Sequence, residues 1–365
     1  YDGSTQIVHM AGSKSATAQT YAKSISKSGK AVLLVGPEDN VTLAEAAISS
    51  LSATGIELTW STLPSTAVYL TVTAAIFDNV TVRSVTQPAE NSTTTVNDLG
   101  YDPDLLLVFS SFTTLGNAIA QPMRFSFGFH TASSDMAASY HERTFAADSE
   151  PTNRLGTDYA LYRTQQGALD LYQGDLALVT GGFTYQSLDE AGAGDVTVVA
   201  IDTGSTGTSV QVVDTPTSTG AANLFGSALA FQPGMVLAFG TWRSAVDADG
   251  AAGATDGDAG AWAITQAIDG AEYSTAWAIE DAQATTDTQS LSDNQWLNMP
   301  DDSGANAITV TGATWGSDNV ALTWGAVDGT ARKMLVLAVE LIEVDPSGTD
   351  YFQTSMRSGL TVGMP

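Results

Sequence analysis

The deciding stretch of the sequence reads Leu322-Thr323-Trp324, then a turn, then Leu335-Val336-Leu337-Ala338-Val339. A hydroxyl residue between an apolar and an aromatic residue gives the alternation of a strand with one buried face. The second run is strongly apolar, as in a strand buried deeply. Two strands joined by a turn containing Gly or Asp are most simply a β-hairpin, which we expect here.

The same pattern occurs three times along the chain. Leu58-Thr59-Trp60 precedes Val68-Tyr69-Leu70-Thr71-Val72, and Phe183-Thr184-Tyr185 precedes Val196-Thr197-Val198-Val199. A pattern repeated at long intervals is typical of an array of similar structural units. We therefore expect a tandem array in which each hairpin closes one unit.

A second repeated phrase supports two of these units. Gly100-Tyr101-Asp102-Pro103 precedes the apolar run 105–109, and Ala230-Phe231-Gln232-Pro233 precedes the apolar run 235–239. Proline cannot donate to a sheet ladder, so each proline is expected at the start of a strand. No matching phrase precedes Trp60, and the first unit is therefore expected to lack its opening half.

These repeats divide the chain into units and connections. Their lengths suit domains that each bury a core. The segment 43–51 fits both a short helix after a capping box and a strand, and we favour the strand because context overrides local propensity. The expected organisation is an incomplete N-terminal β unit at 1–80, a linker at 81–91, a second β-sandwich unit at 92–203, a linker rich in Gly, Ser, Thr and Pro at 204–220, a third β-sandwich unit at 221–344 and a tail at 345–365.

The composition favours an all-β protein. Hydrophobic residues make up 43% of the 365 residues, which is enough for packed cores. Thr, Val, Ser, Gly and Ala dominate between short turns, as in sandwiches with regularly spaced strands. The predicted fold class is all-β, with tandem jelly-roll-like antiparallel β-sandwich units, the first of them incomplete.

The charge is strongly acidic. Forty Asp and Glu residues oppose 13 Lys and Arg residues, a net charge of −27. Such a surface repels nucleic acid and anionic membranes, so a nucleic-acid partner and membrane insertion are not expected. Asp exceeds Glu and there are only five lysines, a composition that suits a marine or halophilic host. The chain has no cysteine, which excludes disulfides and thiolate metal sites. It also lacks a long apolar run and the features of a secretion signal.

The phrase with Pro103, the run Arg124-Phe125-Ser126-Phe127-Gly128-Phe129 and the closing Gly182-Phe183-Thr184-Tyr185 resemble tandem β-sandwich repeat proteins of tailed phages and prophages. In the third unit Ala230 replaces the glycine of the phrase. The resemblance implies a virion surface, decoration or tail protein. It implies no catalytic residue.

Candidate metal ligands are few. His9, His130 and His141 are far apart, and a metal site of His130, His141 and Glu142 is a weak alternative to isolated side chains. The acidic loop containing Asp247, Asp249, Asp256 and Asp258 is the better candidate, because Asp alternating with Gly can direct oxygens toward Ca²⁺. It is not an EF-hand. The simpler interpretation of this loop is an exposed acidic insertion, so calcium is possible and no other cofactor is expected.

Six of the seven tryptophans lie in the third unit. Exposed aromatic rings on a sandwich can stack on sugars, and Trp296, flanked by polar residues, is the candidate for carbohydrate or receptor contact. The simpler interpretation is that most of these rings fill the core, Trp324 first among them. Paired carboxylates could also support glycoside hydrolysis, but 40 acidic residues form such pairs by chance.

Three sequons begin at Asn40, Asn79 and Asn91, and their glycosylation depends on the host. Together these features predict a non-enzymatic virion structural protein, located on the virion surface or extracellular, that binds copies of itself and other virion proteins. The alternative is an extracellular adhesin that binds a host-surface glycan, and a surface glycoside hydrolase is a distant third.

The tail supplies one more expectation. The segments 80–85 and 209–213 are expected strands ahead of the second and third units, and 352–362 resembles them. The chain thus ends with what looks like the opening strand of a unit, and it begins with a unit that lacks one. We expect a strand from another chain to complete the first unit by β-augmentation, and the tail is a candidate for that strand.

Overall fold

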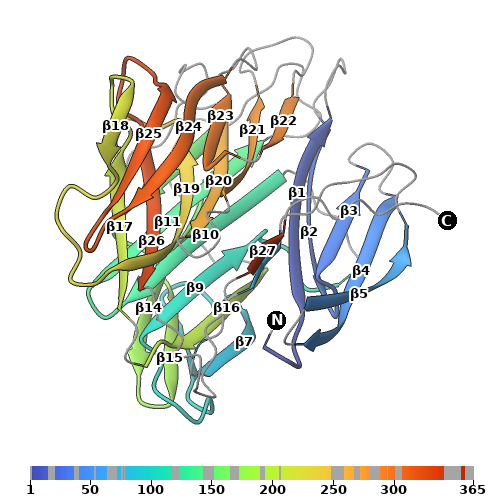
Figure 1. The fold of residues 1–365 in the computed structure, drawn as a ribbon. Coiled ribbons are helices and arrows are strands. Elements are labelled where there is room, and N and C mark those ends of the chain that lie inside the picture. The colour runs from blue at the N-terminus through green and yellow to red at the C-terminus, as the bar shows by residue number, and fades with distance from the viewer. Residues whose placement is uncertain are drawn as a thin grey trace.

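The computed structural model describes residues 2–14, 21–36, 41–52, 55–63, 72–74, 77, 79–116, 123–142, 152–164, 172–189, 194–204, 207–247, 259–266, 272–279, 288–293, 295–300, 306–340 and 355–357. Within these ranges the regular elements are β-strands and there is no helix. The strands form several antiparallel sheets packed together (Figure 1). The predicted all-β class is confirmed.

One pair of sheets, called sandwich A, is formed by residues between 79 and 202. Its six-stranded sheet has the order β12-β11-β10-β9-β16-β7, and its four-stranded sheet has the order β13-β14-β15-β8. The strands are β7 (Asn79–Thr86), β8 (Thr93–Val96), β9 (Leu105–Ser110), β10 (Met123–Thr131), β11 (Ser134–Glu142), β12 (Thr152–Gly156), β13 (Leu161–Arg163), β14 (Tyr172–Val179), β15 (Gly182–Ser187) and β16 (Asp195–Asp202).

A second pair, called sandwich B, is formed by residues between 208 and 340. Its sheets have the orders β22-β21-β20-β19-β26-β17 and β23-β24-β25-β18, so adding ten to each strand number of sandwich A gives sandwich B. The strands are β17 (Thr208–Asp214), β18 (Gly220–Asn223), β19 (Pro233–Thr241), β20 (Ala259–Gln266), β21 (Glu272–Ile279), β22 (Thr288–Asp293), β23 (Leu297–Pro300), β24 (Asn306–Trp315), β25 (Val320–Ala326) and β26 (Lys333–Glu340).

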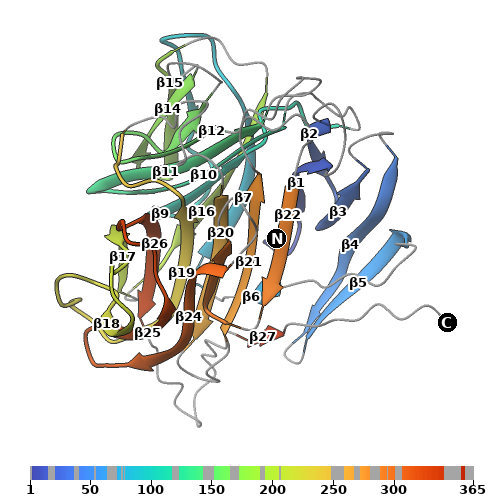
Figure 2. The ribbon, with the colours of Figure 1, turned by 90° about the horizontal axis from the view of Figure 1, so that it is seen from above.

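The four sheets form four layers, with the two six-stranded sheets in the middle (Figure 2). Each sandwich has its own core, around Tyr172 and Tyr185 in A and around Trp296 and Trp324 in B. A third core joins the two six-stranded sheets, and it includes Phe127 of A and Phe239 of B. The middle sheets are thus covered on both faces, which explains why their strands read as apolar runs.

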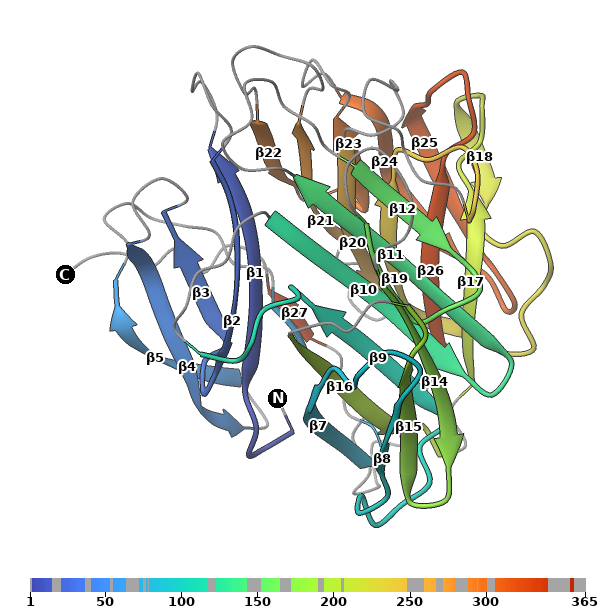
Figure 3. The same ribbon diagram turned by 180° about the vertical axis from the view of Figure 1, so that it is seen from behind.

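The N-terminal part of the chain lies beside the four layers. We call β1 to β5 the arm: a hairpin of β1 (Ile7–Lys14) and β2 (Tyr21–Ser28), and a sheet of β3 (Val32–Val35), β4 (Thr42–Ser52) and β5 (Gly55–Thr62). Figures 1 and 3 show the three-stranded sheet on the far side of the hairpin from the sandwiches. A separate small sheet joins β6 (Val72–Ala74) to β27 (Ser355–Arg357).

Two of the three predicted hairpins are wrong, although their strands exist. In sandwich A, Phe183 to Tyr185 lie in β15, which pairs with β14 and β8, while β16 pairs with β7 and β9 in the opposing sheet. β25 and β26 are divided between two sheets in the same way. The connection crosses from one layer to the other, and alternation identifies a strand without identifying its partner. In the first copy, β5 pairs with β4, and residues 68–71 lie outside the described ranges.

Several other predictions are confirmed. Residues 43–51 lie in the strand β4, and the segments 80–85 and 209–213 lie in β7 and β17. Pro103 shortly precedes β9 and Pro233 begins β19, where the register with β26 shifts between Pro233 and Met235. A proline at the start of a strand removes a donor where the ladder is already irregular.

Candidate functional site

The arm carries the exposed apolar surface of the described chain. The large hydrophobic side chains found exposed are Leu34, Val41, Leu43 and Leu63, and all of them belong to β3, β4 or their flanks and the end of β5. Residues 1–80 contain four lysines and six acidic residues, a net charge of −2 out of −27. The N-terminal unit is thus nearly neutral in an acidic chain, and its exposed apolar side chains make the arm the candidate interaction surface.

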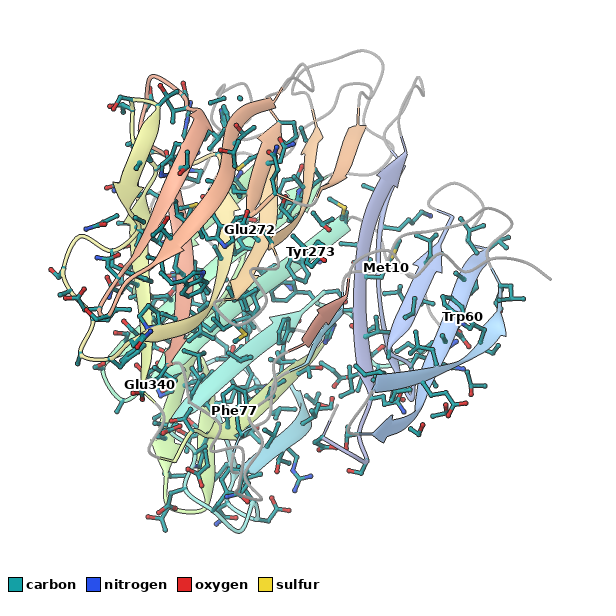
Figure 4. All side chains as sticks on the ribbon, in the orientation of Figure 1. Met10, Trp60, Phe77, Glu272, Tyr273 and Glu340 are labelled. Atoms are coloured by element: carbon teal, nitrogen blue, oxygen red, sulfur yellow. The ribbon has the colours of Figure 1, made fainter. Side chains whose placement is uncertain are left out.

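Alternation within β3 explains this exposure. Leu33 and Val35 are buried against Val8, Met10 and Ile25 of the hairpin, in a small core of the arm. Leu34 lies between them on the opposite face of the strand and is 37% exposed. Figure 4 shows Met10 between the hairpin and the three-stranded sheet, and Trp60 on β5. β3 therefore packs Leu33 and Val35 on the hairpin and leaves Leu34 partly exposed on its other face.

A charged cluster holds β4 against the hairpin. The Glu45 carboxylate accepts a hydrogen bond from the Lys27 ammonium, lies 2.7 Å from Lys30 Nζ, and accepts another bond from Ser61 Oγ at 2.8 Å. The hydrogen bonds from Lys27 and Lys30 outweigh burial and lower the pKa of Glu45 to about 2. Two of the five lysines of the chain are thus engaged inside the arm.

A histidine and four hydroxyl groups join the hairpin to sandwich A. His9 Nε2 is 2.7 Å from Thr197 Oγ1 of β16, and His9 Nδ1 is 2.8 Å from Ser26 Oγ. Ser26 Oγ in turn lies 2.6 Å from Ser111 Oγ and 2.8 Å from Thr113 Oγ1, both beyond the end of β9. Burial lowers the pKa of His9 to about 4, despite the nearby Asp195 carboxylate, which raises it.

This junction is a docking contact of neutral groups. The Asp195 carboxylate accepts hydrogen bonds from Thr86 Oγ1 at 2.8 Å and from the Leu115 backbone at 2.6 Å, so it orients loops of sandwich A. The hydroxyl groups around His9 bond to one another as well as to the ring. Such a network fixes geometry when all its members are satisfied.

Apolar and backbone contacts complete the junction. Ala11 and Ala22 of the hairpin pack against Met123 and Tyr140 of sandwich A and against Trp277 of sandwich B. The hairpin thus covers one margin of the contact between the two six-stranded sheets.

Asp2 attaches the start of the arm to the edge strand β7. Its carboxylate accepts hydrogen bonds from the backbone of Thr5 at 2.6 Å, of Val82 at 2.9 Å and of Ser4 at 2.9 Å. Burial raises the pKa of Asp2, but these hydrogen bonds outweigh it and lower the pKa to about 2. The N-terminal part of the chain is therefore held on sandwich A at two places, by Asp2 on β7 and by His9 on β16.

The acidic loop is only partly described. Both carboxylate oxygens of Asp247 accept bonds from Thr157 of sandwich A, one from its backbone at 2.8 Å and one from its hydroxyl at 2.7 Å. Asp247 therefore joins the two sandwiches. Asp249, Asp256 and Asp258 lie outside the described residues, so the calcium site stays a prediction. In the part of the chain that the structure describes, no group of three or more His, Asp or Glu side chains could hold a metal ion.

The histidine alternative is not supported by the register. His130 pairs with Asp135 at one end of β10 and β11, whereas His141 pairs with Arg124 toward the other end. The two pairs are six positions apart along β10, a distance of about 20 Å at 3.3 Å per residue. His130 Nδ1 instead contacts Asp135 Oδ1 at 2.6 Å.

The exposure expected for Trp296 is wrong. Its side chain is fully buried in the core of sandwich B, together with Trp324, whose burial was expected. The next residues, Leu297, Asn298 and Met299, are also buried, so the side chains of β23 lie in the core although β23 is the last strand of its sheet and has polar neighbours in the sequence. Trp296 therefore offers no platform for a sugar.

Two of the three sequons begin at described residues. Asn79 is exposed at the start of β7, and its amide donates to Asp202 Oδ2 at 2.9 Å. Asn91 is exposed in a turn with a positive φ of 57°, and Asn40 lies outside the described residues. Their modification stays a prediction.

Sequence reasoning missed the His9 junction. Its hydroxyl partners come from Ser26, Ser111, Thr113 and Thr197, which are up to 188 residues from His9. In a chain rich in Ser and Thr, no spacing signal marks these four residues. The exposure of the apolar side chains of the arm was also hard to predict. Polar residues beside Val41, Leu43 and Leu63 in the sequence were its only local signal.

Comparisons of the chain with models of known protein families, with curated proteins and with solved structures find no match. The described residues contain no helix long and apolar enough to cross a membrane. The function must therefore be inferred from the residues and their geometry.

Proposed function

We propose that the chain is a non-enzymatic structural protein of a tailed virus particle, placed on the capsid surface or in the tail. It is built from tandem, jelly-roll-like sandwich units in which the chain passes several times between two sheets. It acts by associating with copies of itself and with other particle proteins.

The observation that carries the proposal is the common strand order of sandwiches A and B. Ten strands in each follow the same path, and Pro103 and Pro233 stand at corresponding places before β9 and β19. The same path through ten strands is what we expect of two copies of one unit. We interpret the two sandwiches as repeats of one unit whose loops differ.

The packing of the sandwiches supports a role in assembly. They meet through apolar side chains on their six-stranded sheets, among them Phe127, Phe129 and Phe239. Modules joined by an apolar sheet-to-sheet contact form a rigid rod or block, which suits a particle component. The exposed apolar side chains of the arm add a surface for further contacts.

The charge supports an exterior location. A protein with a net charge of −27 is repelled by the packaged nucleic acid and stays soluble between particles. The same charge suits a marine or halophilic host, where salt screens the repulsion within the fold. We therefore place the protein on the particle surface, with a host glycan as a conditional partner.

The alternatives have less support. The adhesin proposal depended on an exposed Trp296, and this ring is buried. The hydrolase proposal depended on an identifiable pair of carboxylates, and the described acidic side chains in contact with others, such as Asp247 and Glu45, serve structural hydrogen bonds.

The test is to locate the protein in purified particles. Quantitative mass spectrometry should find it at many copies per particle, and electron cryo-microscopy should show paired sandwiches repeated on the shell or along the tail. A protein absent from purified particles but present free in the medium would contradict the proposal.

A further inference from the structure

We propose that β27, near the C-terminus, is the opening strand of the N-terminal unit, and that a second copy of this chain supplies it when copies assemble. The inference rests on the proposed self-association and names the surface responsible for it. The acceptor is the strand β6, and the donor is the segment 355–357.

The pairing of β27 with β6 repeats the pairing of the first and last strands in each sandwich. In sandwich A, the opening strand β7 pairs with the closing strand β16, and Arg83 lies opposite Val198. In sandwich B, β17 pairs with β26, and Gln211 lies opposite Val336. In the small sheet, Arg357 lies opposite Val72. All three ladders are antiparallel.

The match extends along the ladder. A hydroxyl residue lies two positions before Arg83, Gln211 and Arg357 in their strands. Each of these hydroxyl residues lies opposite an alanine. The pairs are Thr81 with Ala200, Ser209 with Ala338, and Ser355 with Ala74. Because a shift by one residue would exchange the faces of a strand, a common register means a common structural position.

The acceptor strand also has the expected place in the chain. Val72 follows Trp60 of β5 by 12 residues, Val336 follows Trp324 of β25 by 12, and Val198 follows Tyr185 of β15 by 13. The order of β3, β4 and β5 is that of β13, β14 and β15, the strands that precede β16. β6 is therefore the closing strand of the N-terminal unit.

The connection to β27 differs from the connections to the other opening strands. Four residues separate β6 from β7 and five separate β16 from β17, whereas 14 residues separate β26 from β27. An extended connection of this length reaches about 50 Å, because each residue spans at most about 3.6 Å. It can lead either to β6 of its own chain, as in the structure, or to β6 of a neighbour.

Exchange between copies keeps the same ladder. The contacts of β27 with β6 are identical within one chain and between two chains, so the exchange costs little beyond the entropy of association. The acceptor belongs to a unit with a net charge of only −2, and the remaining residues carry −25. A strand that arrives from a second copy therefore meets less repulsion at this unit than elsewhere on the chain.

The contact is directional because the donor and acceptor strands differ. A contact between different surfaces of identical chains links them head to tail, which gives a closed ring or an open chain of copies. Both arrangements occur where a particle needs one protein repeated around an axis or along a tube. In the particle, successive copies of the chain would therefore all point the same way around the ring or along the open chain.

Engineered cysteines test the exchange cleanly, because the chain has none of its own. Thr73 lies opposite Met356, so Thr73→Cys and Met356→Cys are placed for a disulfide. The two variants are made in separate full-length chains, mixed at high concentration and oxidised. We expect a disulfide-linked dimer that contains one chain of each kind. Mixing Met356→Cys with Thr323→Cys, an exposed position on β25, is the matched control and should give at least tenfold less dimer.

Truncation supplies a second readout. A chain that ends after Pro346 lacks β27, and it should sediment as a monomer at concentrations where the full chain associates. The chain with both Thr73→Cys and Met356→Cys should give dimers and larger species as its concentration rises. If that chain gives solely an internal disulfide at every concentration, exchange is excluded. If it gives no disulfide at all, the assignment of β27 to β6 is wrong.

These outcomes separate the inference from the proposed function. A protein that is abundant in particles but never forms the mixed disulfide retains the proposed function and loses the exchange. A protein that forms the mixed disulfide but is absent from particles retains the exchange and loses the proposed function.

Discussion

Tyr140 of β11 and Trp277 of β21 occupy the same position in the two six-stranded sheets, and their rings meet edge to face. The ring centroids are 5.9 Å apart and the ring planes are 86° apart. Phe109 and Phe239 define the common position, because each lies six residues after the matched proline and starts the same path across neighbouring strands. A residue that contacts its own counterpart lies near a two-fold axis.

The contact between the sandwiches therefore has the form of a two-fold interface between two sheets of the same strand order. The hairpin of the arm covers this interface at the Tyr140–Trp277 pair through Ala11 and Ala22. Without the hairpin, the margin of the contact at Tyr140 and Trp277 would be exposed to water.

Trp277→Ala is expected to destabilise the protein by about 2–4 kcal/mol, because it opens a gap between the sandwiches and the hairpin. Tyr140→Ala should act at the same place, and the two changes should be non-additive by about 0.5–1.5 kcal/mol. Urea unfolding of the single and double variants measures this coupling. Thr323→Ala, on an exposed face of β25, is the control; additive effects of Tyr140→Ala and Trp277→Ala would contradict the contact.

Trp296→Ala is expected to cost about 3–5 kcal/mol of unfolding free energy, because the ring is fully buried in sandwich B. A surface ring that binds sugar would give almost no change in stability. Thermal unfolding of Trp296→Ala and Trp296→Phe distinguishes these cases, and the Phe variant should recover part of the loss.

Acid should weaken the docking of the arm through His9. The pKa of His9 is about 4 in the folded protein, whereas a histidine in an unfolded chain has its ordinary pKa of 6.5. Between these values the unfolded chain binds the proton more strongly, so the free energy of unfolding falls as the pH falls from about 6.5 to about 4. The full loss is about 3 kcal/mol, at 1.36 kcal/mol per pKa unit.

His9→Gln removes this titration and keeps a hydrogen-bonding side chain. Urea unfolding at several pH values should show that the stability difference between the natural chain and His9→Gln changes between pH 6.5 and 4 and is constant above that window. The variant retains His130 and His141, so their titration cancels in the difference. A difference that does not depend on pH would exclude His9 as the titrating group.

Asp247→Ala should loosen the contact between the two sandwiches. The change removes both acceptors of Thr157 and places Ala at a positive φ of 54°, with an expected cost of about 1–3 kcal/mol. Asp247→Asn keeps one acceptor and tolerates the left-handed conformation, so it should cost less. Faster hydrogen exchange at the Thr157 amide in the Ala variant, and much less in the Asn variant, is the expected result.

Salt should stabilise the protein. Forty acidic residues against 13 basic ones repel one another in the folded state, and ions screen this repulsion. The midpoint of thermal unfolding should rise as NaCl increases from about 0.05 M to about 1 M, where the Debye length falls to about 3 Å. Sodium sulfate and sodium chloride compared at equal ionic strength separate screening from the exclusion of salt from the surface.

The sequence predicted strands better than it predicted their partners. The alternation around Phe183 and Leu322 and the apolar runs 196–199 and 335–339 do lie in strands, but seven residues between β15 and β16 can form either a turn or a crossing between sheets. No local pattern distinguishes the two. The common path became visible only when the order of all ten strands in each sandwich was known.

The candidate site was predictable only in its outline. The resemblance between the tail and the segments 80–85 and 209–213, which lie in β7 and β17, indicated an opening strand, and β27 does pair with β6. The His9 junction was not predictable, because tertiary folding brings its hydroxyl groups from three separate parts of the chain. Trp296 was placed wrongly because polar neighbours in sequence say little about burial when side chains alternate between two faces.

The double covering of the middle sheets has a consequence for how the protein opens. The central strands β9, β16, β19 and β26 have neighbouring strands on both sides and a packed layer above and below. Their amide protons can reach solvent only when whole layers separate, so they should be the last to exchange with deuterium. Hydrogen exchange of those four strands would thus measure the cooperative separation of the layers. Hydrogen exchange of the arm would measure the separate detachment of the arm from sandwich A.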